Sequence, residues 1–335
     1  MNARSPDNPR PLALLSFDVE EHCQIEAARG TVDPRHWSRW PGRIEHNLDW
    51  LLPTLADHKA MATFFVLGWV ARQRPWIVRR IAEAGHELAC HGYAHDRLHR
   101  LDARRLAIDL AAARAAIEDQ TQQRLRGYRA PSFSLSADTA WAVDVIARQG
   151  FDYDSSVQPI HHPTYGQADA PRRPYRLAGR SGATLAELPP MTWQVGRYRL
   201  PVAGGGYFRL LPLWTMRRGI AQADRDGWPG VTYFHPWEFD AHQPRLPLSP
   251  KQQLRTYLGL RQTRRRLARL LRTVQALSYS AWLDQADASD WPIYHLPAGQ
   301  GAHGDAGRAA FDVLRQQGDV ALRAAAEPQR RAAAA

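Results

Sequence analysis

Apolar residues recur along the chain in two patterns. Short, almost continuous apolar runs are typical of buried strands, and apolar residues three and four apart are typical of amphipathic helices. The predicted strands cover residues 12–17, 62–67, 87–90 and 231–234. The predicted helices cover residues 44–58, 75–84, 102–119 and 136–148, with Asp102 as an N-cap. Strand and helix alternate, which predicts an α/β fold with a parallel sheet, as a (β/α) barrel or a doubly wound sheet.

The composition divides the chain into four parts. Residues 1–10 are polar and rich in proline and predict a flexible arm, whereas residues 11–250 predict one large α/β domain. Within that domain, residues 159–206 are rich in Pro, Gly and Arg and predict an irregular loop insertion. Residues 251–296 predict a basic helical extension packed on the domain, and residues 297–335 predict a low-complexity, disordered tail.

The net charge of the chain is +11, and it is unevenly distributed. Eight basic residues and no acidic residue lie between Lys251 and Arg272. Such a run is typical of a solvated helix face, and it also suits an anionic partner such as a membrane surface, a polyanionic glycan or a nucleic acid. The hydrophobic share of 44% and the charged share of 23% exclude a wholly disordered chain.

The sequence favours a cytoplasmic protein. Its longest nearly apolar stretch, residues 61–71, is far shorter than the roughly 18–20 residues that a membrane span needs. The apolar run at residues 12–15 is too short for the core of a signal peptide. The two cysteines, Cys23 and Cys90, cannot form a disulfide framework, so we expect reduced thiols.

Polar side chains that could do chemistry gather just after the predicted strands. They are Asp18, Glu20, Glu21, His91, His95, Arg129, Asp154 and His235. The carboxyl ends of parallel strands meet at one edge of a sheet, so these residues can converge there. Each also has an ordinary interpretation as a helix cap, an ion pair or a core histidine, but their joint recurrence at strand ends favours a site.

The spacing of His91 and His95 is that of a metal-ligand pair. On a helical turn, imidazoles four residues apart face the same way and can bind one cation. A carboxylate from Glu20 or Asp18 would complete a His-His-carboxylate face with open positions, which is typical of catalytic metal sites. The other carboxylate could accept a proton from water that the metal activates.

Two further residues complete an acid–base pattern. His235 is a candidate general acid, because imidazole titrates near neutral pH. Arg129 is a candidate partner for the base carboxylate, whose pKa it would depress. Together these residues predict metal-assisted hydrolysis of an amide.

Five motifs in this order resemble the polysaccharide deacetylase family, also known as the NodB-homology or carbohydrate esterase family four domain. The motifs are Ser16-Phe-Asp18-Val-Glu20, His91-Gly-Tyr-Ala-His95, Arg129-Ala-Pro131, Gly150-Phe-Asp-Tyr-Asp154-Ser-Ser156 and Phe234-His235. The resemblance covers residues 12–238. Residues 233–240 and 243–245 further resemble a subfamily associated with exopolysaccharide loci of the exosortase type.

This resemblance implies a distorted (β/α) barrel and a divalent metal, usually zinc, with cobalt and nickel as alternatives. It implies removal of acetyl groups from N-acetylated sugars of a polysaccharide or its lipid-linked precursor. The implied roles are Glu20, His91 and His95 as metal ligands, Asp18 as base, His235 as acid, Arg129 and Asp154 as supporting residues, and Tyr93, Pro131, Ser155 and Trp237 as substrate contacts. The backbone N–H of Tyr93 would stabilise the oxyanion.

Two departures from the family pattern bear on these roles. Val19 separates two carboxylates that are adjacent in the family, so Asp18 and Glu20 could exchange the roles of base and ligand, with Glu21 as a third option. Gly92 stands where the family commonly has Ser or Thr.

Other functions and partners stay open at this point. A small-molecule amidohydrolase of cyclic amides or ureides would use the same site, and an inactive glycan-binding protein would keep only the fold. The expected partners are an N-acetylated polysaccharide or oligosaccharide and, through residues 251–272, the anionic inner face of the membrane or an exopolysaccharide machinery. A nucleic acid is not expected, because it would leave the acid–histidine clusters without a purpose.

Overall fold

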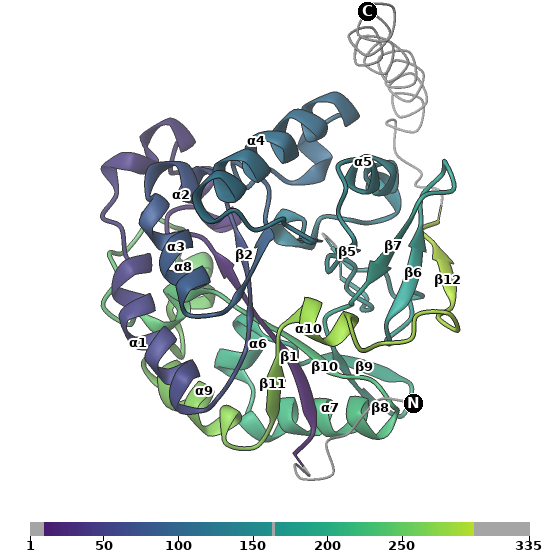
Figure 1. Cartoon of the computed structure of the whole chain (residues 1–335). Helices are drawn as coiled ribbons and strands as arrows, with labels where there is room; N and C mark the ends of the chain where they lie inside the picture. The colour runs from purple at the N-terminus through teal and green to yellow at the C-terminus, as the bar shows by residue number, and fades with distance from the viewer. Residues whose placement is uncertain (1–9, 163–164, 298–335) are drawn as a thin grey trace, which may run out of the picture.

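A computed structural model describes residues 10–162 and 165–297 of the protein. The predicted arm and tail, apart from residues 10 and 297, lie outside these described residues. The fold is a mixed α/β architecture with a central sheet and helices placed around it (Figure 1). The predicted α/β class is therefore confirmed.

The described chain contains the following regular elements. The strands are β1 (Leu12–Val19), β2 (Thr63–Val66), β3 (Glu87–Cys90), β4 (Gly127–Tyr128), β5 (Tyr153–Asp154), β6 (Tyr175–Ala178), β7 (Thr184–Glu187), β8 (Thr192–Val195), β9 (Tyr198–Pro201), β10 (Gly230–Phe234), β11 (Gln275–Leu277) and β12 (Ile293–His295). The α-helices are α1 (Ile44–Asp57), α2 (Gly68–Gln73), α3 (Pro75–Glu83), α4 (Ala103–Thr121), α5 (Ala142–Arg148), α6 (Gly205–Leu210), α7 (Leu213–Arg225), α8 (Pro250–Tyr257), α9 (Thr263–Leu271) and α10 (Tyr279–Leu283).

The central sheet is almost entirely parallel. Its strands follow the order β10-β1-β2-β3-β4-β5-β7-β6-β12, and only β6 and β7 pair in an antiparallel sense. On the edge of β1 opposite to β10, the first half of the strand pairs with β11 and the second half with β2. Among the described residues no pairing joins β12 back to β10, so the path of strands stays open, in keeping with a distorted barrel.

The strand β1 is central because its sequence is apolar on both faces. Every residue after Leu12 is buried, as a continuous apolar run requires when a strand is covered on both sides. Helix α4 packs an apolar stripe that includes Leu106 and Leu110 toward the core. It begins at the predicted N-cap, Asp102, whose side chain accepts a hydrogen bond from the backbone N–H of Arg105. Helix α4 packs against α2, α3 and α5 and contacts β3, the strand that precedes His91 and His95.

The segment at residues 159–206 forms strands, so its prediction as an irregular insertion is wrong. Strands β6 and β7 extend the central sheet, and β8 and β9 form a separate two-stranded sheet. In β6, buried and half-buried residues alternate over only four positions. Such short alternation is a weak signal beside the many Pro, Gly and Arg residues between the strands.

The segment at residues 251–296 is part of the fold rather than a helical extension packed on it. Its basic helix is divided into α8 and α9 near Gly259, which has a φ of 85°. Strand β11 then joins β1, and β12 joins β6. The predicted helix at 136–148 is likewise shorter, because one turn of 3-10 helix precedes α5.

The buried His86 is expected to make the fold sensitive to acid. Its ring packs on Phe64 with 5.2 Å between the ring centroids, and only 5% of the residue is exposed. Burial lowers the pKa of His86 to about 4, so the unfolded chain takes up a proton near pH 6.5 that the folded chain excludes. The free energy of unfolding should therefore fall as the pH drops from 6.5 towards 4. Urea denaturation at pH 7 and pH 5 should show a smaller loss for His86→Gln than for the wild type, and equal losses would contradict this role.

Candidate active site

The predicted catalytic and metal-ligating residues converge at the carboxyl ends of β1, β3 and β10. Asp18 lies at the end of β1 and Glu20 just beyond it, while His91 and His95 follow β3 and His235 follows β10. The strands β10, β1, β2 and β3 are parallel neighbours, so their carboxyl ends share one edge of the sheet. The sequence therefore brings its strand-end residues to one place.

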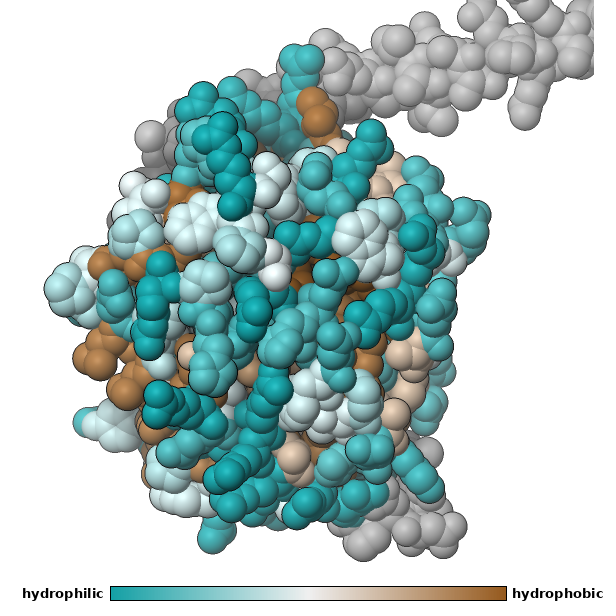
Figure 2. All heavy atoms as spheres, turned by 90° about the vertical axis from the view of Figure 1, so that its left-hand side faces the viewer, coloured by the Kyte–Doolittle hydropathy of each residue, from teal (hydrophilic) through white to brown (hydrophobic). Residues whose placement is uncertain are grey.

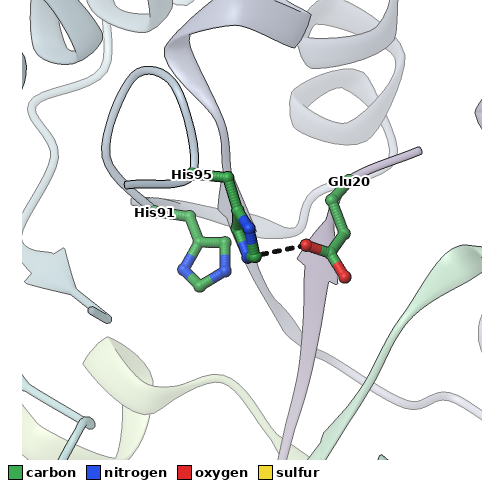
Figure 3. A group of neighbouring side chains, drawn as sticks. All are labelled: Glu20, His91 and His95. Carbon is green, nitrogen blue, oxygen red and sulfur yellow. Dashed lines mark ion pairs between the residues drawn. The ribbon is translucent and has the colours of Figure 1, made fainter. Parts of the chain in front are cut away.

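Glu20, His91 and His95 form a cluster that fits a metal ion (Figure 3). One ligand atom from each of them lies within 4.8 Å of the other two. The closest pair is Glu20 Oε2 and His95 Nε2, at 2.8 Å. Three protein ligands are typical of a catalytic metal site, which keeps a position open for water or substrate. One carboxylate and two imidazoles suit zinc, and also cobalt and nickel.

The charge in this cluster also favours a cation. Burial raises the pKa of Glu20, but His95, His235 and His91 together lower it to about 2, so the buried carboxylate is an anion. Within the described residues, His95 Nδ1 has no hydrogen-bond partner, and the contact of Glu20 Oε2 is the one with His95 Nε2. A buried anion is costly unless a cation compensates it. The residues present therefore fit a divalent metal.

A loop, and not the predicted helical turn, brings His91 and His95 together. Gly92 and His95 have φ values of 75° and 53°. A positive φ is uncommon for a residue other than glycine, so the surroundings must enforce it at His95. A Cβ atom at Gly92 would lie 3.0 Å from Asp109 Oδ2, which together with the positive φ explains why glycine stands there.

Hydrogen bonds orient two of the three candidate metal ligands, His91 and Glu20. His91 Nδ1 lies 2.8 Å from the backbone oxygen of Arg129, so Nδ1 carries the proton and Nε2 is free to bind a metal. The indole N–H of Trp237 donates to Glu20 Oε1 at 3.1 Å. Such partners fix a ligand's geometry before the metal arrives.

Asp18 lies beside the cluster and is held from one side. Arg129 Nη1 donates to Asp18 Oδ1 at 2.5 Å. The other oxygen, Oδ2, lies 4.0 Å from His91 Nε2 and 3.8 Å from His235 Nε2. One carboxylate oxygen is thus fixed and the other faces two site histidines, which favours Asp18 as the base and Glu20 as the ligand.

Arg129 is fully buried and uses its whole guanidinium group. Besides Asp18, it donates to the hydroxyls of Ser16, Ser155 and Tyr279 and to the backbone oxygen of Ser155. Its guanidinium carbon lies 4.0 Å from the centroid of the Phe65 ring. Ser155 is itself fully buried and supports Arg129 through its hydroxyl and its backbone oxygen, while its contact with a substrate stays a prediction.

Removing Arg129 is expected to destabilise the fold strongly. Arg129→Met would leave the buried Asp18 carboxylate without its ion pair, and breaking a buried pair costs about 3–5 kcal/mol. The matched control is Arg124→Met, because Arg124 makes an exposed pair with Asp152 that is worth at most about 1 kcal/mol. Urea denaturation at pH 7 measures both, and a loss below about 1 kcal/mol for Arg129→Met would contradict this expectation.

One ring nitrogen of His235 contacts a carboxylate, and the other ring nitrogen faces the site. His235 Nδ1 lies 3.0 Å from Glu238 Oε2, and Glu238 Oε1 accepts a bond of 2.8 Å from Arg209 Nε. His235 Nε2 lies 3.8 Å from both Asp18 Oδ2 and Glu20 Oε1. Burial lowers the pKa of His235, but Glu238, Glu20 and Asp18 raise it more, to about 9. The imidazole is then charged at neutral pH and can donate a proton from Nε2.

Two other predicted substrate contacts have different surroundings from those expected. The backbone N–H of Tyr93 donates to Asp109 Oδ2 at 2.8 Å, so it is not available as the predicted oxyanion donor. Trp237 is only 6% exposed and stacks on His235 at 5.3 Å between centroids, so it helps to fix the orientation of the His235 ring. A substrate contact by the buried Pro131, which lies near Gly92, stays a prediction.

Asp154 supports the site through a neighbour. It accepts bonds from the backbone N–H and the hydroxyl of Ser156, at 2.9 and 2.7 Å. The Ser156 hydroxyl accepts a bond of 2.7 Å from the backbone N–H of Ala130, next to Arg129. Glu187 lies against Asp154, and burial raises the pKa of both carboxyl groups. Asp154 therefore steadies the Arg129 segment without touching the metal cluster.

Glu21 is not a metal ligand. Its carboxylate accepts hydrogen bonds from the backbone N–H groups of Arg43 and Ile44, where α1 begins, and pairs with Arg74. A carboxylate is favourable at a helix N-terminus, where backbone N–H groups lack partners. The third option for the metal carboxylate is therefore wrong.

Sequence reasoning gave no role to several residues that the site uses. Glu238 follows His235 by three residues, and that short spacing is a signal that could have paired the two. Arg209, Tyr279 and Ser16 reach the site from distant elements or within an apolar strand, so no spacing points to them.

Known families match two adjacent parts of the chain. The profile of the polysaccharide deacetylase family matches residues 32–153, and a domain of unknown function matches residues 155–284. The first range contains His91, His95 and Arg129, and the second contains His235. The two carboxylates on and after β1 precede both ranges, so the site joins three parts of the sequence.

Individual relatives agree with this family. A chitooligosaccharide deacetylase from Rhizobium leguminosarum bv. trifolii is 30% identical over 124 residues, which cover 36% of this chain and 52% of that protein. The peptidoglycan-N-acetylglucosamine deacetylase PgdA from Listeria monocytogenes is 30% identical over 103 residues, which cover 28% of this chain and 22% of that protein. The chain thus spans about half or less of the length of these relatives.

A solved structure supports the fold. The crystal structure of a Mycobacterium smegmatis protein, provisionally assigned as a polysaccharide deacetylase, aligns with a TM-score of 0.55 and 23% identity. The alignment covers 90% of this chain and 99% of that one. The shared fold thus extends well beyond the matched family profile. Residues 32–153 of the chain are thus similar to the polysaccharide deacetylase family, and the fold of the chain is that of the Mycobacterium smegmatis structure.

Proposed function

We propose that the protein is a metal-dependent hydrolase that removes N-acetyl groups from amino sugars of a glycan. The observation that carries this proposal is the Glu20–His91–His95 cluster, beside which Asp18 Oδ2 and His235 Nε2 lie 3.8 Å apart. The names of the relatives, a chitooligosaccharide deacetylase and a peptidoglycan-N-acetylglucosamine deacetylase, support the substrate class. Zinc is the proposed metal, with cobalt and nickel as alternatives.

The residues divide the work of amide hydrolysis between them. Glu20, His91 and His95 would hold a divalent metal, which would supply Lewis-acid polarisation of the acetamide and activation of water. Asp18 accepts a proton from the attacking water at Oδ2, because Arg129 occupies Oδ1. His235 donates a proton from Nε2 to the departing amine, while Glu238 holds its other nitrogen. Acetate and a free amino sugar leave.

A substrate panel tests this proposal against its alternatives. We expect the zinc-loaded protein to release acetate from N-acetylglucosamine oligomers and to leave a cyclic ureide such as allantoin unchanged. Hydrolysis of the ureide alone would identify a small-molecule amidohydrolase. Binding of the oligomers and of one zinc without any acetate release would identify an inactive glycan-binding protein.

We further propose that the reaction serves exopolysaccharide synthesis on the cytoplasmic side of the membrane. The resemblance of residues 233–240 and 243–245 to the exosortase-associated subfamily supports this setting. In the part of the chain that the structure describes, no helix is long and apolar enough to span a bilayer. The glycan would then be met as a precursor that is still attached to its carrier.

A further inference from the structure

A groove with a largely apolar lining runs along α8, outside the site described above. Its volume is about 580 Å³, and its walls include Leu248, Leu254, Tyr257 and Leu258. Leu254 is 62% exposed and Leu258 is 49% exposed. The face that carries α1, α3 and α8 is mostly hydrophilic, with hydrophobic atoms gathered toward its left edge (Figure 2). Large apolar side chains left in water around a hollow are typical of a binding site for an apolar group.

Several side chains around this groove carry a positive charge. Arg245 lines it, with its guanidinium carbon 4.0 Å from the centroid of the Tyr257 ring. Lys251 and Arg255 are exposed on α8 itself. The sequence has no acidic residue from position 241 to position 283. An apolar groove with a cationic rim is complementary to an amphiphile whose head group is an anion.

Two arginines of the basic run are engaged in the packing of α9. Arg264 donates to the backbone oxygen of Phe239 and lies over the Trp50 ring, and Arg266 donates to the backbone oxygen of Leu211. These two side chains are half-buried and serve the packing of α9. The exposed cations that line the apolar groove or lie on α8 are Arg245, Lys251 and Arg255.

Arg209 connects the groove with the proposed general acid. Its Nε donates to Glu238, which in turn bonds to His235. Its two other nitrogens donate to backbone oxygens of α8 and its end, those of Arg255, Thr256 and Leu258. In addition, Trp237 packs in one hydrophobic cluster with Leu248 and Tyr257. The groove is thus one layer of side chains away from the site.

We infer that the α8 groove binds the lipid end of a lipid-linked glycan, whose sugar end reaches the active site. This inference rests on the proposed function and names its substrate class. The apolar chain lies against Leu254 and Leu258, and the phosphate that joins chain and sugar faces Arg245 and Lys251. A plain oligosaccharide lacks both groups and gains nothing from the groove.

Two measurements test the inference. The first compares kcat/KM for an N-acetylglucosamine oligomer with kcat/KM for the same oligomer joined to a dodecyl chain through a phosphodiester. We expect the wild type to favour the lipid-linked form by roughly tenfold or more, since each buried methylene adds to binding. In Leu254→Gln/Leu258→Gln this ratio should fall to near one. The matched control is Ile108→Gln, which changes an exposed apolar residue on α4 and should keep the ratio.

The second measurement is titration calorimetry with dodecyl phosphate, which needs no turnover. Binding by the wild type and its loss in the double variant would support the groove even if deacetylation failed. Deacetylation of both substrates without lipid preference and without dodecyl phosphate binding would overturn the inference and leave the proposed function intact. A double variant that keeps its lipid preference but loses binding to anionic vesicles, or changes oligomeric state, would assign the groove to a membrane or a second copy and also overturn it.

Discussion

Replacing His95 with alanine is expected to abolish zinc binding and to lower acetate release by about 10³-fold or more. A metal contributes several kcal/mol of transition-state stabilisation, and each 1.36 kcal/mol is worth a factor of ten. His95 supplies one of only three ligands in the cluster of described residues, and its Nε2 lies 2.8 Å from the Glu20 carboxylate. With His95 gone, one imidazole and one carboxylate remain, too few to hold zinc tightly.

The experiment needs a control for the loss of a histidine as such. His36→Ala removes an exposed imidazole from a 3-10 helix far along the sequence from the ligand loop. Zinc content, measured by atomic absorption after dialysis, and acetate release should both stay at the wild-type level in this variant. A His95→Ala protein that retains one zinc and full activity would show that the cluster is not the metal site.

Among changes that leave the metal ligands in place, Asp18→Asn is expected to cause the largest fall in the rate of acetate release. This change keeps the shape of the side chain but removes the base, and general base catalysis contributes about 10²–10⁴ in rate. Because Asp18 is held by Arg129 and not by the ligand histidines, we expect zinc affinity to change little while kcat falls. Circular dichroism checks that the chain still folds around the altered Arg129 pair.

The comparison with Glu20→Gln separates the base from the ligand. Glu20 lies 2.8 Å from His95 and is a buried anion within the ligand cluster, so its neutral replacement should weaken zinc binding first. Activity of Glu20→Gln should recover in part at high zinc concentration, whereas that of Asp18→Asn should not. Zinc loss in Asp18→Asn together with zinc retention in Glu20→Gln would mean that the two carboxylates exchange roles.

The parts of the fold that the sequence predicts well are those with a strong local pattern. The continuous apolar run of β1 and the apolar stripe of α4, with its cap at Asp102, lie where the pattern places them. The strands between residues 159 and 206 have only four residues each, and their partners are distant or equally short. Whether those residues form strands depends on their pairing across the sheet, and the local sequence pattern carries no information about that pairing.

The same distinction holds for the candidate site. Residue type and strand-end position predict that Glu20, His91 and His95 lie together, because parallel strands align their carboxyl ends. The loop that positions the histidines depends on positive φ values, and the hydrogen bonds of Tyr93 and Ser155 depend on their exact neighbours. A motif gives the kind of residue, but only the packed structure shows which donors are already used.

The proposed deacetylase activity depends on one metal held by Glu20, His91 and His95. The most direct test is to strip the protein with a chelator, add zinc stepwise, and follow both bound zinc and acetate release from N-acetylglucosamine oligomers. We expect activity to rise from near zero in proportion to bound zinc and to reach its plateau at about one zinc per chain. Full activity in the stripped protein, or acetate release that does not follow bound zinc, would contradict it.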